Sequence, residues 1–208
     1  MRQDLSQSWD RKLFTFYLLT MIITVLDTET SGLDDSRHEI LEVALVSYVL
    51  SNEGQFFHLK ELNEKIKPHR IHLANSKALT INGYTEKKWE NSKEMSKVLP
   101  KIKEMIKESD LLLGQNLIFD LRFLQKASLT EIDFPPYIDT KAMADFLVRK
   151  NWLRRSKMDY LVEHYNVEVK GRAHTALVDC YRTYEVFKKL LSDIGDYDLY
   201  TFEKPYNY

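Results

Sequence analysis

The feature that most constrains the fold is a short apolar run that ends directly in two acids. Residues 22–26 are apolar or β-branched, and they lead into the segment Asp27-Thr28-Glu29-Thr30-Ser31-Gly32-Leu33. Side chains alternate along a strand with period two, so a strand here places Asp27 and Glu29 on the same face. Two neighbouring carboxylates repel each other unless a cation lies between them, and oxygen-only ligands favour Mg²⁺ or Mn²⁺. A plain turn with solvated acids is the alternative for an isolated Asp-x-Glu.

The composition is that of a soluble, folded chain. A length of 208 residues with 44% hydrophobic and 29% charged residues predicts one generous domain with its own core. The single cysteine, Cys180, excludes an intrachain disulfide and predicts a reducing compartment, the cytoplasm. The formal net charge of −1 is far from that of a protein that coats duplex DNA, although it is compatible with a few phosphate contacts.

The apolar run that begins at residue 13 raises the question of an export signal or a membrane span. Acidic Asp4 and Asp10 lie upstream of it, and no small-residue cleavage site follows. The run is also too short to cross a bilayer. We therefore expect no membrane association, a strand in the second half of the run, and an N-terminal extension of residues 1–20 without an assigned role.

The hydrophobic pattern predicts strands first and helices later. The expected strands cover residues 22–28, 40–50, 55–66 and 111–114, with a hairpin turn at residues 51–54. The expected helices cover residues 92–108 (broken at Pro100), 117–127, 139–148, 157–165 and 174–191. The buried face of the last helix is predicted to consist of Leu177, Tyr181, Tyr184, Phe187 and Leu191. A three-strand antiparallel meander followed by helix–strand alternation predicts an α/β fold, with helices flanking a mixed sheet.

Two later segments supply further acids. Asp120 follows the strand at residues 111–114 and falls in the first turn of a helix, where the helix dipole alone favours an acid. His174 and Asp179 are five residues apart, about 140° on a straight helix, so they converge only if His174 lies at the helix start. The alternative is that His174 caps the helix and Asp179 faces solvent. Apolar neighbours predict that Asp179 is partly buried, and a buried carboxylate needs a partner or a metal.

Taken in order, these segments resemble the DEDDh group of 3′→5′ exonucleases, the DnaQ-like family that includes the proofreading subunit of bacterial DNA polymerase III. The matching motifs are Asp27-x-Glu29-Thr-Ser-Gly-Leu, Asn116-x-x-Phe-Asp120 and His174-x-x-x-x-Asp179. Residues 40–44, 78–85 and 138–140 add supporting matches, and the resemblance covers about residues 22–191. The family commonly has His-Asn where this chain has Gln115-Asn116.

The resemblance implies a ribonuclease H-like fold, with an exonuclease domain over residues 21–192 and an aromatic C-terminal tail over residues 193–208. It implies that two divalent metal ions, Mg²⁺ or Mn²⁺, flank the scissile phosphate and are held by Asp27, Glu29, Asp120 and Asp179. His174 is then the general base, because an imidazole with an ordinary pKa near ~6.5 is mostly neutral at physiological pH. The residues expected to line the substrate 3′ end are Thr30, Gly32 and Leu33, with Asn116 as a weaker candidate. Core packing is the alternative for Leu33.

The substrate implied is the 3′ end of a single strand, with DNA favoured over RNA because residues 138–140 fit the DnaQ-like pattern better. An RNA or oligoribonucleotide exonuclease is the alternative, since discrimination depends on the 2′-hydroxyl, which no motif reveals. Another class remains open: an accessory module of a DNA polymerase with little activity, which docks through aromatic residues 197–208. Finally, residues 149–157 carry five basic side chains around Trp152, either to guide the strand or as a solvated loop.

Overall fold

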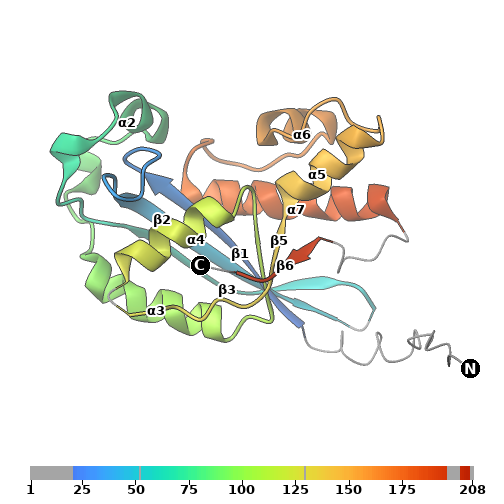
Figure 1. The fold of residues 1–208 in the computed structure, drawn as a ribbon, viewed down its shortest axis with the longest axis horizontal. Helices are drawn as coiled ribbons and strands as arrows, with labels where there is room; N and C mark the ends of the chain where they lie inside the picture. The colour runs from blue at the N-terminus through green and yellow to red at the C-terminus, as the bar shows by residue number, and fades with distance from the viewer. Residues whose placement is uncertain (1–20, 52, 129, 196–201, 207–208) are drawn as a thin grey trace, which may run out of the picture.

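The protein folds around one six-stranded mixed sheet (Figure 1), described here from a computed structural model. Residues 21–51, 53–128, 130–195 and 202–206 are described, so the expected extension at residues 1–20 lies outside them. The strand order is β3-β2-β1-β4-β5-β6. The strands are β1 (Met21–Thr30), β2 (Ile40–Leu50), β3 (Phe56–Lys65), β4 (Leu111–Gly114), β5 (Tyr137–Asp139) and β6 (Glu203–Lys204).

Strand direction divides the sheet into two parts. β1, β2 and β3 form the antiparallel meander, whereas β4 pairs with β1, and β5 with β4, in parallel. β6 closes the far edge by antiparallel pairing with β5. The predicted α/β fold with a mixed sheet is therefore confirmed. The parallel part matters for function, because the carboxyl ends of β1, β4 and β5 meet at the same edge.

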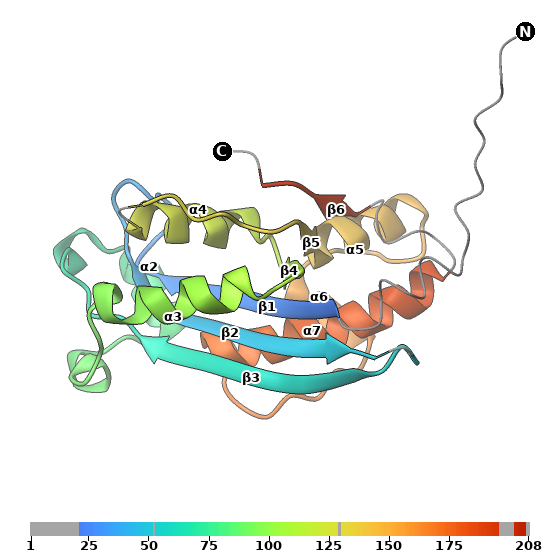
Figure 2. The ribbon, with the colours of Figure 1, turned by 90° about the horizontal axis from the view of Figure 1, so that it is seen from below.

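Helices cover both faces of the sheet (Figures 1 and 2). The helical elements are η2 (Ile71–Leu73), α2 (Ser76–Asn82), η3 (Glu86–Trp89), α3 (Met95–Lys107), α4 (Ile118–Ala127), α5 (Thr140–Arg149), α6 (Met158–His164) and α7 (Ala176–Ile194). One core cluster joins α5, α6 and α7 to one face of the sheet, and a second joins α3 and α4 to the other. Among the described helices, none has the length and apolar character needed to cross a bilayer.

Several boundaries differ from the sequence expectation for physical reasons. β1 continues through Thr30 because its pairing with β2 extends to Thr30 opposite Ile40, with a register shift between Glu29 and Thr30. α3 is not broken at Pro100, since the buried side chains of Val98 and Ile102 on either side hold it against the sheet. The short elements η2, α2, η3, β5 and β6 were not expected. Of these, α2 and η3 are capped locally by the side chains of Asn75 and Thr85, whereas β5 and β6 form by pairing in the sheet.

The expected buried face of α7 is partly wrong. Tyr184 and Phe187 are buried, but Leu177, Tyr181 and Leu191 are only partly so. The face against the sheet is rotated, and its fully buried members include Cys180, Thr183, Leu190 and Ile194. The difference arises because the apolar stripe of this helix is wider than its contact with the sheet, and Tyr181 instead reaches the β3 carboxylate of Glu61.

The last described residues belong to the same domain. Phe202 is buried and contacts Phe146 of α5 edge to face, with 5.5 Å between ring centroids. Tyr206 packs against Phe134 in the same way, at 4.8 Å. Residues 202–206 therefore extend the sheet edge, whereas the other aromatic residues expected in a docking tail lie outside the described residues.

Candidate active site

Four carboxylates and one imidazole lie at the edge of the sheet where the parallel strands end. Asp27 and Glu29 are on the last four residues of β1, on the same face as predicted. Asp120 is in the first turn of α4, which follows β4, and Asp179 is in the first turn of α7. Because β4 runs parallel to β1, its carboxyl end delivers α4 to the same place as the end of β1.

Asp120 is buried and is fixed in place by Thr28 of β1. The Thr28 backbone N–H and its hydroxyl both donate to Oδ1 of Asp120, with donor–acceptor distances of 2.9 and 2.6 Å. The sequence places these two residues 92 positions apart. The strand that carries Asp27 and Glu29 therefore also orients the third acid.

His174 lies just before α7, as its convergence with Asp179 requires. Its backbone has φ 60°, a left-handed conformation that is uncommon for a residue other than glycine. Its N–H donates to Oδ2 of Asp179 over 2.8 Å, which holds the turn in this conformation. On its other side, Asp179 pairs with Arg182 one turn further along α7, at 3.4 Å.

The acids of the cluster hold protons more tightly than usual. Burial and then the neighbouring Asp120 and Glu29 charges raise the pKa of Asp27 well above its usual value of 3.8. Burial and the neighbouring carboxylates raise the pKa of Glu29 from 4.5 to about 8. Burial also raises the pKa of Asp120 to about 7, against the two hydrogen bonds from Thr28, which lower it. A bound cation relieves this repulsion.

The donor set suits a hard divalent ion. Ligand atoms of Glu29, His174 and Asp179 all lie within 4.8 Å of one another, close enough to share one ion. Carboxylate oxygens are the preferred ligands of Mg²⁺ and Mn²⁺, and the raised pKa values indicate surplus negative charge. The cluster therefore fits a divalent cation.

A fifth acid, Glu42, borders the cluster and was not among the predicted site residues. It lies opposite Glu29 on β2, is 3% exposed, and approaches Lys65 of β3 at 4.0 Å. Its carboxylate accepts a hydrogen bond from the backbone N–H of Ala176, the first residue of α7. The helix N-cap residue, Thr175, makes no side-chain cap of its own. Glu42 therefore caps α7 from the sheet. A single acid inside the apolar strand 40–50 is the signal that could have identified it.

Arg172 is a second residue that the sequence did not single out. Its guanidinium donates to the carbonyl oxygens of Thr80 and Ile81, over 3.4 and 3.0 Å, and so ties the segment before His174 to the end of α2. It lies directly over Gly83, where a Cβ would fall 1.7 Å from Nη1 of Arg172. No local pattern could reveal this contact, because the partners are 89 positions apart, that is 172 minus 83.

The expected substrate residues on the loop after β1 have different environments. Thr30 is buried, and its hydroxyl donates to the Gly32 carbonyl over 2.7 Å, while its own carbonyl accepts from the Asn82 side chain. Leu33, in contrast, is 85% exposed, so the core-packing alternative for Leu33 is wrong. Hydrogen bonds thus fix the start of this loop at Thr30, whereas the apolar side chain of Leu33 faces solvent.

Asn116 is exposed and has φ 61°, in a turn fixed by Asp139 at the end of β5. The Asp139 carboxylate accepts the backbone N–H groups of Asn116 and Lys141 over 2.8 and 2.9 Å. Gln115 stands where the DEDDh family commonly has a histidine. Its side chain accepts a hydrogen bond from the Thr140 hydroxyl and donates one to the Ser156 carbonyl. Only Asn116 of this pair is free to face a substrate.

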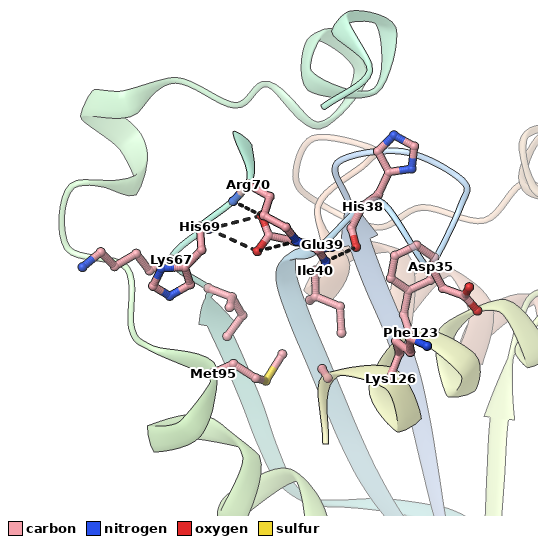
Figure 3. Close-up of a pocket in the computed structure, with 12 residues that line it drawn as sticks. Asp35, His38, Glu39, Ile40, Lys67, His69, Arg70, Met95, Phe123 and Lys126 are labelled. Atoms are coloured by element: carbon pink, nitrogen blue, oxygen red, sulfur yellow. Dashed lines mark hydrogen bonds and ion pairs between the residues drawn. The ribbon is translucent and has the colours of Figure 1, made fainter. Parts of the chain in front are cut away.

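A hollow of about 170 Å³ lies between the loop after β1 and residues 66–70 (Figure 3). Its centre is Glu39, whose carboxylate accepts the backbone N–H groups of His69 and Arg70 over 3.1 and 2.5 Å. Across the loop, Asp35 forms an ion pair with Arg122 of α4 at 2.9 Å. The carboxylates of Glu39 and Asp35 are thus engaged within the protein, and their contacts brace the loop after β1.

A mixed sheet in this order, flanked by helices and with an acidic cluster where its parallel strands end, has the ribonuclease H-like fold. Residues 24–187 match the protein family RNase_T, described as "Exonuclease". The chain belongs to this family of DEDDh-type 3′→5′ exonucleases, whose members depend on divalent metal ions.

Two kinds of curated relative are similar to the chain. DNA polymerase III PolC-type of Thermotoga maritima is 33% identical over 186 residues, which are 86% of this chain but 13% of the relative. Ribonuclease T of Baumannia cicadellinicola is 26% identical over 186 residues, 81% of this chain and 82% of the relative. The chain thus corresponds to a small part of the PolC-type protein and to most of ribonuclease T.

Solved structures agree on the fold. Exonuclease I of E. coli in complex with a dT13 oligonucleotide superposes with a TM-score of 0.67 at 16% identity, covering 84% of this chain and 42% of that chain. The nuclease domain of 3′hExo, a DEDDh family member bound to rAMP, gives 0.64 at 16% identity, covering 84% and 93%.

Proposed function

We propose that this chain hydrolyses single-stranded DNA from its 3′ end and releases nucleoside 5′-monophosphates. The observation that carries the proposal is the convergence of Asp27, Glu29, Asp120, His174 and Asp179 at one sheet edge in an exonuclease-family chain. Fold and packing alone do not require five such groups in one place, since buried acids are costly without a partner.

In this proposal Asp27, Glu29, Asp120 and Asp179 hold two divalent ions, Mg²⁺ or Mn²⁺. Such a pair, when bound, stabilises the charge on the attacking and leaving oxygens of the phosphodiester. Thr28 keeps the Asp120 carboxylate in register with the two acids of β1. The protein's own contribution is thus a set of oxygen ligands held rigidly by two strands and two helices.

His174 takes the proton of the attacking water as general base. It is exposed, so a water can reach its ring, and its backbone is held by Asp179. On the substrate side, exposed Leu33 packs against the terminal base, and exposed Asn116 contacts the strand. Thr30 and Gly32 support the 3′ end through the backbone, because the Thr30 hydroxyl is already engaged.

The preference for DNA is supported by the relatives. The PolC-type protein is a DNA polymerase by name and is 33% identical, against 26% for ribonuclease T. The same comparison supports a proofreading or repair role next to a polymerase partner. The second candidate is an RNA 3′→5′ exonuclease. It is favoured by length, because the chain covers 82% of ribonuclease T but only 13% of the PolC-type protein.

A third candidate is a polymerase-accessory module with little activity. Phe202 and Tyr206 pack against their own domain, which counts against a tail that docks wholly on a partner. Deletion of residues 196–208, followed by separate assays of activity and polymerase binding, distinguishes this candidate. Loss of binding with no activity in either form would favour the module.

The test of the proposed function is a gel time course on a 5′-labelled single-stranded DNA and on the RNA of the same sequence. Reactions contain Mg²⁺, Mn²⁺ or EDTA, with Asp27→Ala as the inactive variant. We expect a metal-dependent ladder that shortens from the 3′ end, faster on DNA, and absent in the variant. A faster RNA ladder would move the assignment to the second candidate, and no ladder from folded protein would refute the enzyme.

A further inference from the structure

A strongly basic segment lies on the surface between α5 and α6, outside the acidic cluster. Residues 149–157 carry five basic side chains and no acid, in a chain whose net charge is −1. All five are exposed: Arg149, Lys150, Arg154, Arg155 and Lys157. Within the described part of the chain, none of them forms an ion pair with a carboxylate, although Arg149 interacts electrostatically with Asp145 of α5 and Lys150 approaches the Phe146 ring. Most of the positive charge, above all that of Arg154 and Arg155, is therefore available to an outside partner.

The same segment holds an indole ring out in solvent on a fixed backbone. Trp152 is 54% exposed, whereas its neighbour Leu153 is 5% exposed and belongs to the core around α7. The backbone N–H groups of both residues donate to the Leu147 carbonyl, over 2.9 and 3.3 Å. Burial of Leu153 thus turns Trp152 outward. A large aromatic side chain exposed on a rigid turn and flanked by cations is typical of a surface that stacks on bases.

A hydrogen bond connects this segment with the turn that leads to the acidic cluster. The Gln115 side-chain Nε2 donates to the Ser156 carbonyl over 3.0 Å. Gln115 is followed by exposed Asn116 and then by α4, which carries Asp120 in its first turn. Residues 154–157 therefore lie beside the turn that carries Asn116 and leads to Asp120.

We infer that residues 149–157 bind the nucleotides upstream of the scissile bond, with Trp152 stacked on an unpaired base and Arg154 and Arg155 on phosphates. The inference depends on the proposed exonuclease function and specifies how the site selects its substrate: a flexible single strand several nucleotides long. A duplex hides the base faces that Trp152 would need. This arrangement also explains how a near-neutral chain binds a polyanion, because the charge is concentrated where the strand passes.

The experiment compares a long and a minimal substrate. The long substrate is a single-stranded 12-nucleotide DNA, and the minimal one is thymidine 5′-(p-nitrophenyl phosphate), which has no upstream nucleotide. The variants are Trp152→Ala, Trp152→Phe and the double variant Arg154→Ala/Arg155→Ala. Lys101→Ala/Lys107→Ala is the matched control, since it removes the same charge from exposed positions of α3, whose end leads into the start of β4, opposite to the acidic edge.

For the 12-mer we expect Trp152→Ala to raise KM about tenfold or more, which is the effect of losing one stacked base. Trp152→Phe keeps an aromatic ring, so its KM should stay close to the wild-type value. The double arginine variant should raise KM and reduce the slope of log KM against log salt by about 1.4, that is ~0.7 for each lost phosphate contact. The values of kcat for the 12-mer and kcat/KM for the minimal substrate should stay at the wild-type level in every variant. The α3 control should resemble wild type on both substrates.

Two results would overturn the inference while leaving the exonuclease intact. One is a wild-type KM for the 12-mer in all three variants, in which case the segment is a solvated loop or binds something other than the strand. The other is an equal loss on both substrates, in which case the segment supports the fold or the acidic cluster. Failure of the wild-type protein to hydrolyse either substrate would instead refute the proposed function itself.

Discussion

The backbone N–H of His174 donates a 2.8 Å hydrogen bond to Oδ2 of Asp179, five residues further along the chain. His174 has a left-handed backbone, which costs on the order of 1 kcal/mol or more for a residue that is not glycine. The bond to Asp179 offsets this cost and fixes the direction of the histidine. One candidate metal ligand thus also sets the position of the candidate base.

This double role predicts different outcomes for two changes at Asp179. Asp179→Asn keeps an oxygen acceptor for the His174 N–H, whereas Asp179→Ala removes it. Both should reduce exonuclease activity by at least ~100-fold, since even residues that only support a metal ligand reach that value. In EDTA, the Asn variant should melt at or above the wild-type temperature, because burial raises the pKa of Asp179 and makes its charge unfavourable. The free energy of unfolding of the Ala variant should be about 1 kcal/mol lower than that of wild type. Equal melting temperatures for Asn and Ala would contradict the positioning role.

The raised pKa values predict that the metal-free protein loses stability as the pH rises. Glu29 shifts from 4.5 to about 8 and Asp120 from 3.8 to about 7. Between these limits the folded state holds protons that the unfolded chain has released. The free energy of unfolding therefore falls as pH increases from about 4 to 8, by on the order of several kcal/mol.

Melting temperatures in EDTA across this pH range measure the effect, and Glu29→Gln is the matched control. The variant should show a flatter pH dependence and a higher melting temperature near pH 8, since it lacks one of the titrating groups. Added Mg²⁺ or Mn²⁺ should stabilise wild type most at the alkaline end, where the carboxylates are ionised. A wild-type melting temperature that is constant or rises with pH in EDTA would refute the prediction.

Thr28 should control the affinity for metal through Asp120. Thr28→Val removes the hydroxyl that donates to Oδ1 and leaves the backbone donor in place. A hydrogen bond to a charged group contributes about 1.5–3 kcal/mol, so the metal concentration for half-maximal activity should rise roughly tenfold or more. Thr28→Ser retains the hydroxyl and should behave as wild type. If Asp120 needs no such support, the metal concentration for half-maximal activity will be the same in Thr28→Val as in wild type.

Glu42 should act on catalysis through the start of α7. Glu42→Ala removes the acceptor for the Ala176 N–H, so we expect kcat to fall about tenfold with little change in KM, within the range for residues that position a metal ligand. Glu42→Gln keeps an oxygen acceptor and should restore most of the rate. If Gln is as inactive as Ala, then the negative charge of Glu42 matters, and it belongs with the metal-binding acids.

The sequence was sufficient to place Asp27 and Glu29 at the end of a strand. β2 spans Ile40–Leu50 as its apolar pattern predicted, and strand periodicity correctly placed Asp27 and Glu29 on one face. Helix geometry gave the condition for His174 to converge with Asp179, namely that His174 lies at the helix start, and the structure meets this condition. The catalytic and metal-binding roles of these residues stay predictions until activity is measured.

The contacts that orient the acids were not accessible from the sequence, because each joins distant segments. Thr28 and Asp120 meet only once β4 is paired beside β1, and Glu42 reaches α7 across the sheet. Short elements such as α2 have no pattern long enough to recognise. Leu33 was ambiguous for another reason: an apolar residue in a loop is predicted to be core by its type and exposed by its location, and only the structure decides.

The contact of Arg172 with Gly83 yields a final prediction, on the loop that leads to His174. Gly83 ends α2 with φ 67°, and a Cβ there would lie 1.7 Å from Nη1 of Arg172. Gly83→Ala should therefore cost about 1 kcal/mol in backbone strain and also displace Arg172 from the carbonyl oxygens of α2. We expect kcat to fall in Gly83→Ala and in Arg172→Ala, because either change releases the segment before His174.

The two losses should not add in the double variant, since each breaks the same contact. Gly54→Ala is the control: Gly54 has φ 75° in the β2–β3 turn, and a Cβ there meets nothing within 4 Å. It should lower the melting temperature through backbone strain alone, by no more than Gly83→Ala does, while leaving kcat unchanged. Additive losses in the double variant would mean that Gly83 and Arg172 act independently, and a fall in kcat for Gly54→Ala would mean that lost stability alone explains the effect. Non-additive losses of kcat at Gly83 and Arg172, together with an unchanged kcat in Gly54→Ala, would show that the contact of Arg172 with α2 holds the His174 loop in its active position.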